Sequence, residues 1–186
     1  MNKSYQNKHV YLAIAVVIAV FSPILYFFLP QTLADIFHNR EGVWFVSVPE
    51  VNFKIFAVGF GLLFISSFIL FLLDVRKLSV SISIVFLLLA AGTFYIASQS
   101  YILLSDENIT YNPFLKFERE TYSWDEVERV IHHRTEMGDI SNYEFVFEDG
   151  KSVIIEDSSY FRNRSFKFNK RLAESNLSVD FQLIEE

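Results

Sequence analysis

A pair of adjacent histidines is the first place in this sequence where side chains could do chemistry. His132 and His133 are of the residue type that most often binds zinc and moves protons near neutral pH. The segment VERVIHHRTE around them is typical of a strand, in which neighbouring side chains point to opposite faces. The two imidazoles therefore cannot easily share one metal ion, and we expect one to be exposed and one to be partly buried.

Two carboxylates offer a second kind of chemistry. Glu118 and Glu120 are two residues apart in the expected strand LKFERETY, so they share a face. Acid–base catalysis needs a pocket that removes water from one of the two, and this face is polar throughout. The chain has no cysteine, which excludes thiolate nucleophiles, thiolate metal sites and disulfides. The sequence predicts no catalytic residue, metal ligand or cofactor site, and we expect that the protein is not an enzyme.

Trp124 is the candidate for a binding groove. This large aromatic side chain stands between an expected strand and the acidic residues Asp125, Glu126 and Glu128. A tryptophan placed in this way either lines a groove or fills a hydrophobic core. Core packing is the favoured interpretation, and the groove is the alternative.

A basic segment near the C-terminus is the candidate for contact with an anionic surface. Five of the ten residues from Arg162 to Arg171 are Arg or Lys, whereas the rest of the C-terminal half is acidic. Helical spacing of Phe161, Phe168 and Leu172 predicts a helix over 158–177 with an apolar face and a basic face. The candidate binding residues are Arg164, Lys167, Lys170 and Arg171. The partner could be anionic lipid or another membrane protein, and the alternative is a solvated face that balances nearby carboxylates.

The elements that must position these residues begin with three long apolar runs. Residues 10–29, 55–73 and 78–97 contain no charged side chain, and each run is long enough to cross a bilayer as a helix. The sequence therefore predicts three membrane spans within a membrane domain over 1–97. Since these spans also lack histidine, no proton relay or ion path is visible, and transport is not expected.

The charge distribution bears on partners and on orientation. The formal charge is −6, and acidic residues outnumber basic ones by 18 to 10 after residue 97, which argues against a nucleic-acid partner. Basic residues close to the spans number four on the side of the N-terminus and three on the other side. The positive-inside rule therefore weakly favours a cytoplasmic N-terminus, and the side of the C-terminal domain stays open.

From Ser98 the sequence changes to short strand-like segments separated by turn residues. The clearest is a hairpin with Asp149 and Gly150 at its turn, and a last strand is expected over 179–184. These features predict a second, soluble domain over 98–186.

This C-terminal domain resembles the bacterial pleckstrin-homology-like (PH-like) domains that are attached to membrane spans. The resemblance rests on four features in order: the strand 101–104 that follows the last span, the step 122–127 around Trp124, the hairpin 148–151 and the helix after it. It implies an α+β fold in which a bent antiparallel sheet is capped by one α-helix. It also implies binding or scaffolding, and it supplies no catalytic residue.

The sequence thus predicts a multi-pass protein of the cell membrane whose soluble domain binds or scaffolds at the membrane surface. The alternative is a small regulatory or immunity-type membrane subunit that acts through its transmembrane helices. Phosphoinositide-type binding is not favoured, because Asp106 and Glu107 occupy the loop in which a dense basic cluster would be needed.

Overall fold

The computed structural model describes residues 2–38, 40–113, 118–135 and 141–184, and it forms two compact units. The helical unit comprises Met1–Ala34 and Val48–Ser100. The sheet unit comprises Asp35–Ser47 and Tyr101–Glu186. The expected division between residues 97 and 98 differs from this one mainly because 35–47 groups with the C-terminal part of the chain.

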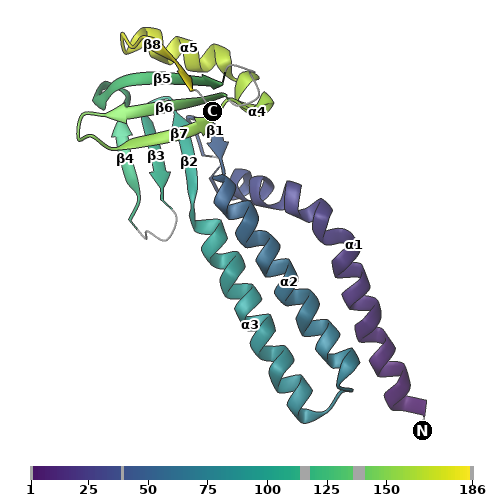
Figure 1. Cartoon of the computed structure of the whole chain (residues 1–186). Coiled ribbons are helices and arrows are strands. Elements are labelled where there is room, and N and C mark those ends of the chain that lie inside the picture. Colours follow the sequence, from purple (N-terminus) through teal and green to yellow (C-terminus); the bar gives the residue numbers. More distant parts are fainter. Residues whose placement is uncertain (1, 39, 114–117, 136–140, 185–186) are drawn as a thin grey trace. The chain divides into compact units, whose positions relative to one another are not determined.

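The helical unit consists of three helices: α1 (Asn2–His38), α2 (Glu50–Leu72) and α3 (Lys77–Gln99). The last residues of α1 extend beyond this unit. Each is long and apolar enough to cross a membrane. Figure 1 shows that α1 bends along its length, and Pro23 and Pro30 lie inside it. Because proline removes a backbone donor and crowds the preceding turn, these two residues account for the bend.

Close packing joins α2 to α3. The Ser66 hydroxyl donates to the Ser83 carbonyl oxygen at 2.9 Å, and the Ser83 hydroxyl donates to the Ser66 carbonyl oxygen at 3.0 Å. Further along, Gly59 lets the Phe94 ring approach so closely that a Cβ at this position would lie 2.6 Å from it. Small and hydroxylated residues of this kind are what closely packed membrane helices use.

The first sheet of the sheet unit includes a strand, β1, that the chain forms between α1 and α2. Its order is β1-β2-β3-β4, all antiparallel, with β1 (Val43–Ser47), β2 (Tyr101–Ser105), β3 (Asn108–Asn112) and β4 (Glu120–Ser123). Trp44 and Phe45 of β1 are buried in the core of this unit. The loop from which they come thus supplies a strand and two large core residues. The expected strand over 115–122 begins outside the described residues.

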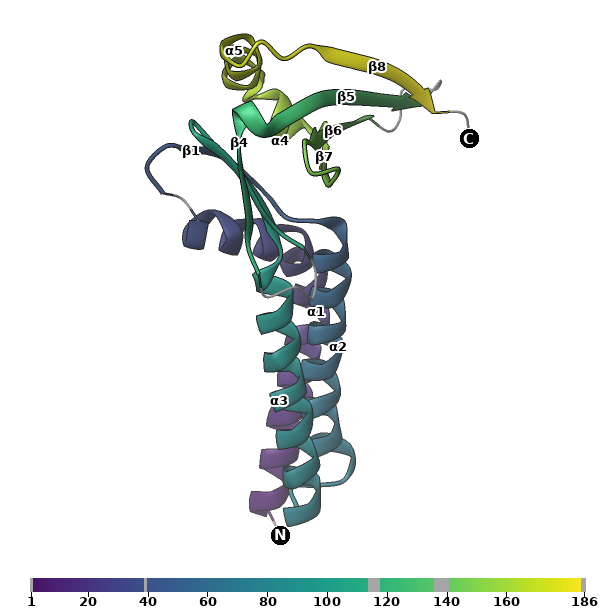
Figure 2. The same cartoon turned by 90° about the vertical axis from the view of Figure 1, so that its left-hand side faces the viewer.

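The second sheet has the order β7-β6-β5-β8, and Figure 2 shows β8 running beside β5. Its strands are β5 (Val127–Thr135), β6 (Ser141–Phe147), β7 (Ser152–Glu156) and β8 (Val179–Ile184), which has the expected bounds. The expectation of a purely antiparallel sheet is wrong in one pair, because β8 runs parallel to β5. A crossover through helices brings the chain back in the same direction as β5.

Two helices stand where one capping helix was expected, namely α4 (Ser159–Arg162) and α5 (Ser165–Glu174). Ser158 caps α4, and its hydroxyl accepts a hydrogen bond from the Phe161 amide at 3.3 Å. The break falls at Arg164, which leaves helical geometry while its guanidinium donates to the Trp44 and Tyr160 carbonyl oxygens. A continuous hydrophobic core draws on both sheets and both helices, and it includes Phe45, Trp124, Phe145, Phe161 and Phe168.

Candidate functional site

The predicted basic face of the C-terminal helix is largely occupied by internal contacts. The Arg164 guanidinium lies 3.9 Å from the Tyr160 ring and donates to the Trp44 carbonyl oxygen at 2.8 Å. Arg171 forms ion pairs with Asp106 and Glu174 at 3.1 and 2.8 Å, and Lys170 lies 3.6 Å from Glu174. Lys167 is exposed. The four candidate residues are therefore not a uniform cationic surface, since Arg164 is turned inward and Arg171 is neutralised.

Trp124 belongs to the core. Its side chain is 4% exposed, its ring stacks near Trp44, and its Nε1 donates to the Ser105 carbonyl oxygen at 3.1 Å. The indole fills the space between the first strands and the second sheet, where it also meets Phe145 edge-on. Of the two interpretations, core packing is the one that this burial supports, and Trp124 itself offers no groove surface.

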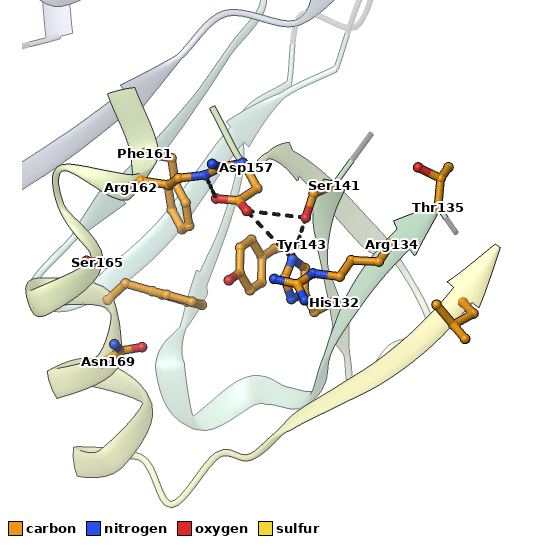
Figure 3. Close-up of a pocket in the computed structure, with 12 residues that line it drawn as sticks. His132, Arg134, Thr135, Ser141, Tyr143, Asp157, Phe161, Arg162, Ser165 and Asn169 are labelled. Atoms are coloured by element: carbon orange, nitrogen blue, oxygen red, sulfur yellow. Dashed lines mark hydrogen bonds and ion pairs between the residues drawn. The ribbon is translucent and has the colours of Figure 1, made fainter. Parts of the chain in front are cut away.

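A pocket of about 650 Å³ lies in the second sheet, between β5, β6, β8 and the helices α4 and α5. Figure 3 shows its residues arranged around the opening. Its lining residues are His132, Arg134, Thr135, Ser141, Tyr143, Asp157, Phe161, Arg162, Ser165, Phe168, Asn169 and Leu183.

Strand register explains why polar groups gather here. Residues directly opposite each other on paired strands share a face, and two such rows cross the sheet at this point. The first row is Phe181, His132 and Tyr143, and the second row is Leu183, Arg134 and Ser141. Aromatic contacts from Phe161 and Phe168 cover Tyr143 in the first row. The second row lies toward the end of the sheet, where the lining includes polar residues of β5 and β6.

The centre of the pocket is a hydrogen-bonded cluster of three side chains. His132 Nε2 lies 2.5 Å from the Ser141 hydroxyl and 3.7 Å from Asp157 Oδ2. The Ser141 hydroxyl donates to the same Asp157 oxygen at 3.2 Å, and Arg162 Nε donates to the other oxygen at 3.1 Å. The imidazole stacks on Tyr143 with ring centroids 4.1 Å apart. Asp157 is thus satisfied on both oxygens, and His132 is fixed in position.

Burial lowers the pKa of His132 below its ordinary value of 6.5, and the nearby Arg134 guanidinium lowers this pKa further. Asp157 acts in the opposite direction. In Figure 3 the Arg134 side chain extends from β5 toward this imidazole. The imidazole is therefore held mainly in its neutral form at neutral pH.

The cluster has the residue types of a serine-hydrolase triad but not the arrangement. In a triad the carboxylate holds one imidazole nitrogen while the serine lies at the other. Here Ser141 and Asp157 both approach Nε2 of His132. Among the described residues no group of three or more His, Cys, Asp or Glu side chains could hold a metal ion.

The second histidine lies on the other face of β5, as strand alternation predicts. His133 Nε2 is 2.8 Å from Glu144 Oε2, and the pair is half-buried. The neighbouring His132 is buried and His133 is half-buried, so both imidazoles are more buried than the expectation of one exposed and one partly buried ring. The buried position was not visible in the sequence, because β8 and the two helices cover it.

A second polar cluster connects the first sheet to the hairpin of the second. Glu120 Oε2 accepts hydrogen bonds from the hydroxyls of Tyr111 at 2.7 Å and Tyr122 at 3.2 Å, and Lys151 Nζ lies 3.0 Å away. The Tyr122 hydroxyl also donates to Asp149 at 2.8 Å. These hydrogen bonds hold the pKa of Glu120 below its ordinary value, with Tyr111 as the largest cause. Glu118 is exposed and is not among the partners of Glu120 in this cluster, so the two carboxylates do not form an acid–base pair.

Comparisons with known proteins give little to set beside this geometry. No family model and no curated protein matches the chain. Among solved structures, the one titled "Structure of the Spt16D Pob3N heterodimer" matches at 8% identity with a TM-score of 0.33. The match covers 47% of each chain, so this chain spans about half the length of that one. A TM-score of this size does not establish a shared fold.

Sequence reasoning found His132 but missed Ser141, Asp157 and Arg134 as its neighbours. Ser141 and Asp157 come from β6 and from the end of β7, and the β5–β6–β7 register brings them to His132. Arg134 lies two residues along β5 on the same face as His132. The available signal was a strand that contains histidine, followed by a strand that begins at Ser141 and by another that ends just before Asp157. That signal becomes visible only once the hairpin register is known.

Proposed function

We propose that this chain is an integral membrane protein in which three helices anchor a non-catalytic, PH-like binding module. The length and apolar character of α1, α2 and α3 support the anchor. The order of elements along the chain supports the module. Strands β2–β4 and β5–β7 come first and helices follow them, which is the order that the resemblance implies. The side of the membrane on which the module works stays a prediction, with the N-terminus in the cytoplasm.

The pocket under α4 and α5 is the observation that carries the binding role. It combines fixed polar groups with an aromatic wall, which is the composition of ligand sites rather than of a packed core. Next to it, Phe181 and Leu183 of β8 are 74% and 68% exposed. Exposed apolar side chains beside a pocket favour an interaction surface.

The arrangement favours binding over catalysis. The Ser141 hydroxyl and Asp157 both approach the same nitrogen of His132, so the imidazole is not set up to take a proton from serine while the carboxylate orients it. The same contacts hold the polar groups rigidly, which lowers the entropic cost of binding a ligand.

Site-specific photo-crosslinking in cells tests this function on the full chain. A photoreactive phenylalanine analogue replaces Phe181 or Leu183 on the pocket side of β8, and the matched control replaces Ile154, which is exposed on the other face of β7. We expect discrete adducts at the two β8 positions and none at Ile154. Equal labelling at all three positions, or none, would argue against a binding module and for a subunit that acts through its helices.

A reporter fused after Glu186 tests the membrane arrangement. Three spans with a cytoplasmic N-terminus put the C-terminus outside, so we expect a reporter that is active only outside the cytoplasm to give signal. Activity of a cytoplasm-only reporter would reverse the orientation. Release of the chain from membranes by alkaline carbonate would contradict the three-span anchor itself.

A further inference from the structure

Among the described residues of the pocket, one cation is left over after the internal pairs are made. Arg162 is bound to Asp157 at 3.1 Å. Arg134 lines the same pocket, and within the described part of the chain its side chain has no hydrogen-bond or ion-pair partner. A guanidinium presents five donors in a planar fork, so an unpaired one beside a pocket is ready to hold an anionic group.

Among the described lining residues the one carboxylate, Asp157, is already in use, whereas donors remain. Asp157 accepts from Arg162 on one oxygen and from Ser141 on the other. The Ser165 hydroxyl and the Asn169 amide line the opposite wall and add hydrogen-bonding capacity from α5. Among the described lining residues, two arginines stand against one aspartate and a neutral His132, so this part of the pocket carries about one net positive charge. This balance excludes a metal cation and favours an anion.

We propose that this pocket binds a carboxylate carried on an apolar body, with Arg134 as the residue that pairs with the carboxylate. This inference names the ligand of the proposed binding module and rests on that proposed function. A carboxylate matches the guanidinium fork through two parallel hydrogen bonds. It also matches the single net charge of the pocket, whereas a phosphate dianion would bring a second charge next to Asp157.

The apolar body has a defined wall to lie against. Tyr143 is the half-buried ring of this wall, and the buried rings of Phe161 and Phe168 pack against it with centroids 5.3 and 5.1 Å away. Leu183 of β8 adds an exposed apolar side chain to the same pocket. About 650 Å³ is enough for an acid of drug-like size or for the last residues of a peptide. A carboxylate at Arg134 with a ring or chain on this wall uses both parts of the pocket.

The test is an NMR titration of the full chain in a nonionic detergent, with ¹³C-labelled histidine so that the His132 resonance reports on the pocket. The first probe is 3-phenylpropionate, and its neutral control is 3-phenylpropionamide. We expect a saturable shift of the His132 resonance with a dissociation constant of roughly 1 mM, and binding of the amide at least tenfold weaker.

Two arginine variants make the test specific to the site. Arg134→Gln removes the proposed cation, and we expect it to weaken 3-phenylpropionate about ten- to a hundredfold. Arg129→Gln removes the same charge from the same strand on the other face of the sheet, and we expect less than a twofold change. Equal weakening by both variants would reduce the effect to general charge and overturn the site.

Further probes identify the source of the carboxylate. A Gly-Gly-Phe tripeptide with a free C-terminus, compared with its amidated form, tests a peptide terminus against a free organic acid. Tight binding of phenyl phosphate with weak binding of every carboxylate would overturn the carboxylate in favour of phosphate chemistry. Absence of a shift with all of these probes at 10-fold the expected dissociation constant, roughly 10 mM, would overturn the ligand assignment. In that case, adducts at Phe181 and Leu183 would still support the binding module.

Discussion

The two polar clusters of the sheet unit use similar residues for different ends. Around Glu120, the hydroxyls of Tyr111 and Tyr122 and the Lys151 amine all contact one carboxylate oxygen of Glu120. Lys151 also lies 3.3 Å from Asp149. Around His132, the aspartate is paired on both oxygens, but Arg134 has no hydrogen-bond or ion-pair partner among the residues that the structure describes. The first cluster is closed, whereas the second has unused donors next to a pocket. The difference teaches that an unmatched charge in a fixed setting, rather than the presence of polar residues, is what distinguishes the proposed ligand site.

The position of each cluster explains this difference. The closed cluster lies between β3, β4 and the β6–β7 turn, so it joins the two sheets, and the rings of Tyr122 and Phe147 stack above it at 3.9 Å. The open cluster lies at the end of the second sheet. A contact that joins two sheets contributes to the fold only when its charges are matched, and a cluster at the end of a sheet is free of that requirement.

The largest expected effect comes from removing β1, which breaks the first sheet and with it the closed cluster. A fragment of residues 98–186 lacks the buried side chains of Trp44 and Phe45. Truncating a buried side chain of this size typically lowers the free energy of unfolding by about 3 to 5 kcal/mol. We expect this fragment not to fold, and we expect residues 35–47 joined by a flexible linker to 101–186 to fold. Dispersion of the backbone amide signals in an NMR spectrum measures the outcome. Native-like dispersion in the 98–186 fragment would contradict the role of β1.

This dependence on β1 also shows where sequence reasoning reaches its limit. Uncharged runs are local patterns, so helices α1 to α3 could be predicted, and the turn at Asp149 and Gly150 fixed the hairpin of β6 and β7. Which strand pairs with β2 is a long-range question. The aromatic residues of the segment VWFVSV favour packing at the membrane interface, and its loose alternation of apolar and polar residues does not reveal that it pairs with β2.

The candidate site was less predictable than the fold for the same reason. The basic run from Arg162 to Arg171 is evident in the sequence, yet packing uses Arg164 and Arg171 internally. Arg134 does not stand out in the sequence, and its importance comes from what its neighbours on other strands have already bound. Charge patterns therefore indicate where cations are, whereas pairing decides which of them remain available.

Removal of one hydroxyl from each cluster sharpens the comparison. Tyr111→Phe deletes the donor at 2.7 Å from Glu120 in a buried position, and we expect a loss of about 1 to 2 kcal/mol in the free energy of unfolding. Ser165→Ala removes a hydroxyl at the wall of the pocket, and we expect a change within about 0.5 kcal/mol. Thermal unfolding of the full chain in detergent compares the two variants. A larger loss in Ser165→Ala would mean that the pocket, too, is a closed structural cluster.

Acidification should act on the closed cluster in a defined direction. The folded-state pKa of Glu120 is lowered, so its contribution to stability is present above the ordinary value of 4.5 and is lost as the pH falls through the folded-state pKa. We expect Tyr111→Phe to flatten the loss of stability below pH 4.5, because it removes the largest cause of the shift. Ser165→Ala, as the control, should keep the wild-type profile. Identical profiles in all three proteins would show that Glu120 does not titrate as this geometry requires.

The smallest expected effect is a change in the pKa of one histidine in the open cluster. Burial and then Arg134 lower the pKa of His132, with Arg162 and His133 acting in the same direction and Asp157 against them. Arg134→Gln removes one of these causes, so the pKa should rise toward 6.5 but stay below it, because burial remains.

The same substitution has a consequence for stability. A lowered folded-state pKa means that stability is present above pH 6.5 and declines as the pH falls from 6.5 to the folded-state value, so Arg134→Gln should reduce this decline. NMR titration of the His132 ring in both proteins measures the shift, and Arg129→Gln serves as the control of equal charge. A bound carboxylate should raise the pKa of His132 in the wild type in the same direction, since it neutralises Arg134. An unchanged His132 pKa in Arg134→Gln would mean that the guanidinium does not act on the imidazole, and the pocket would then lose the cation on which its difference from the closed cluster depends.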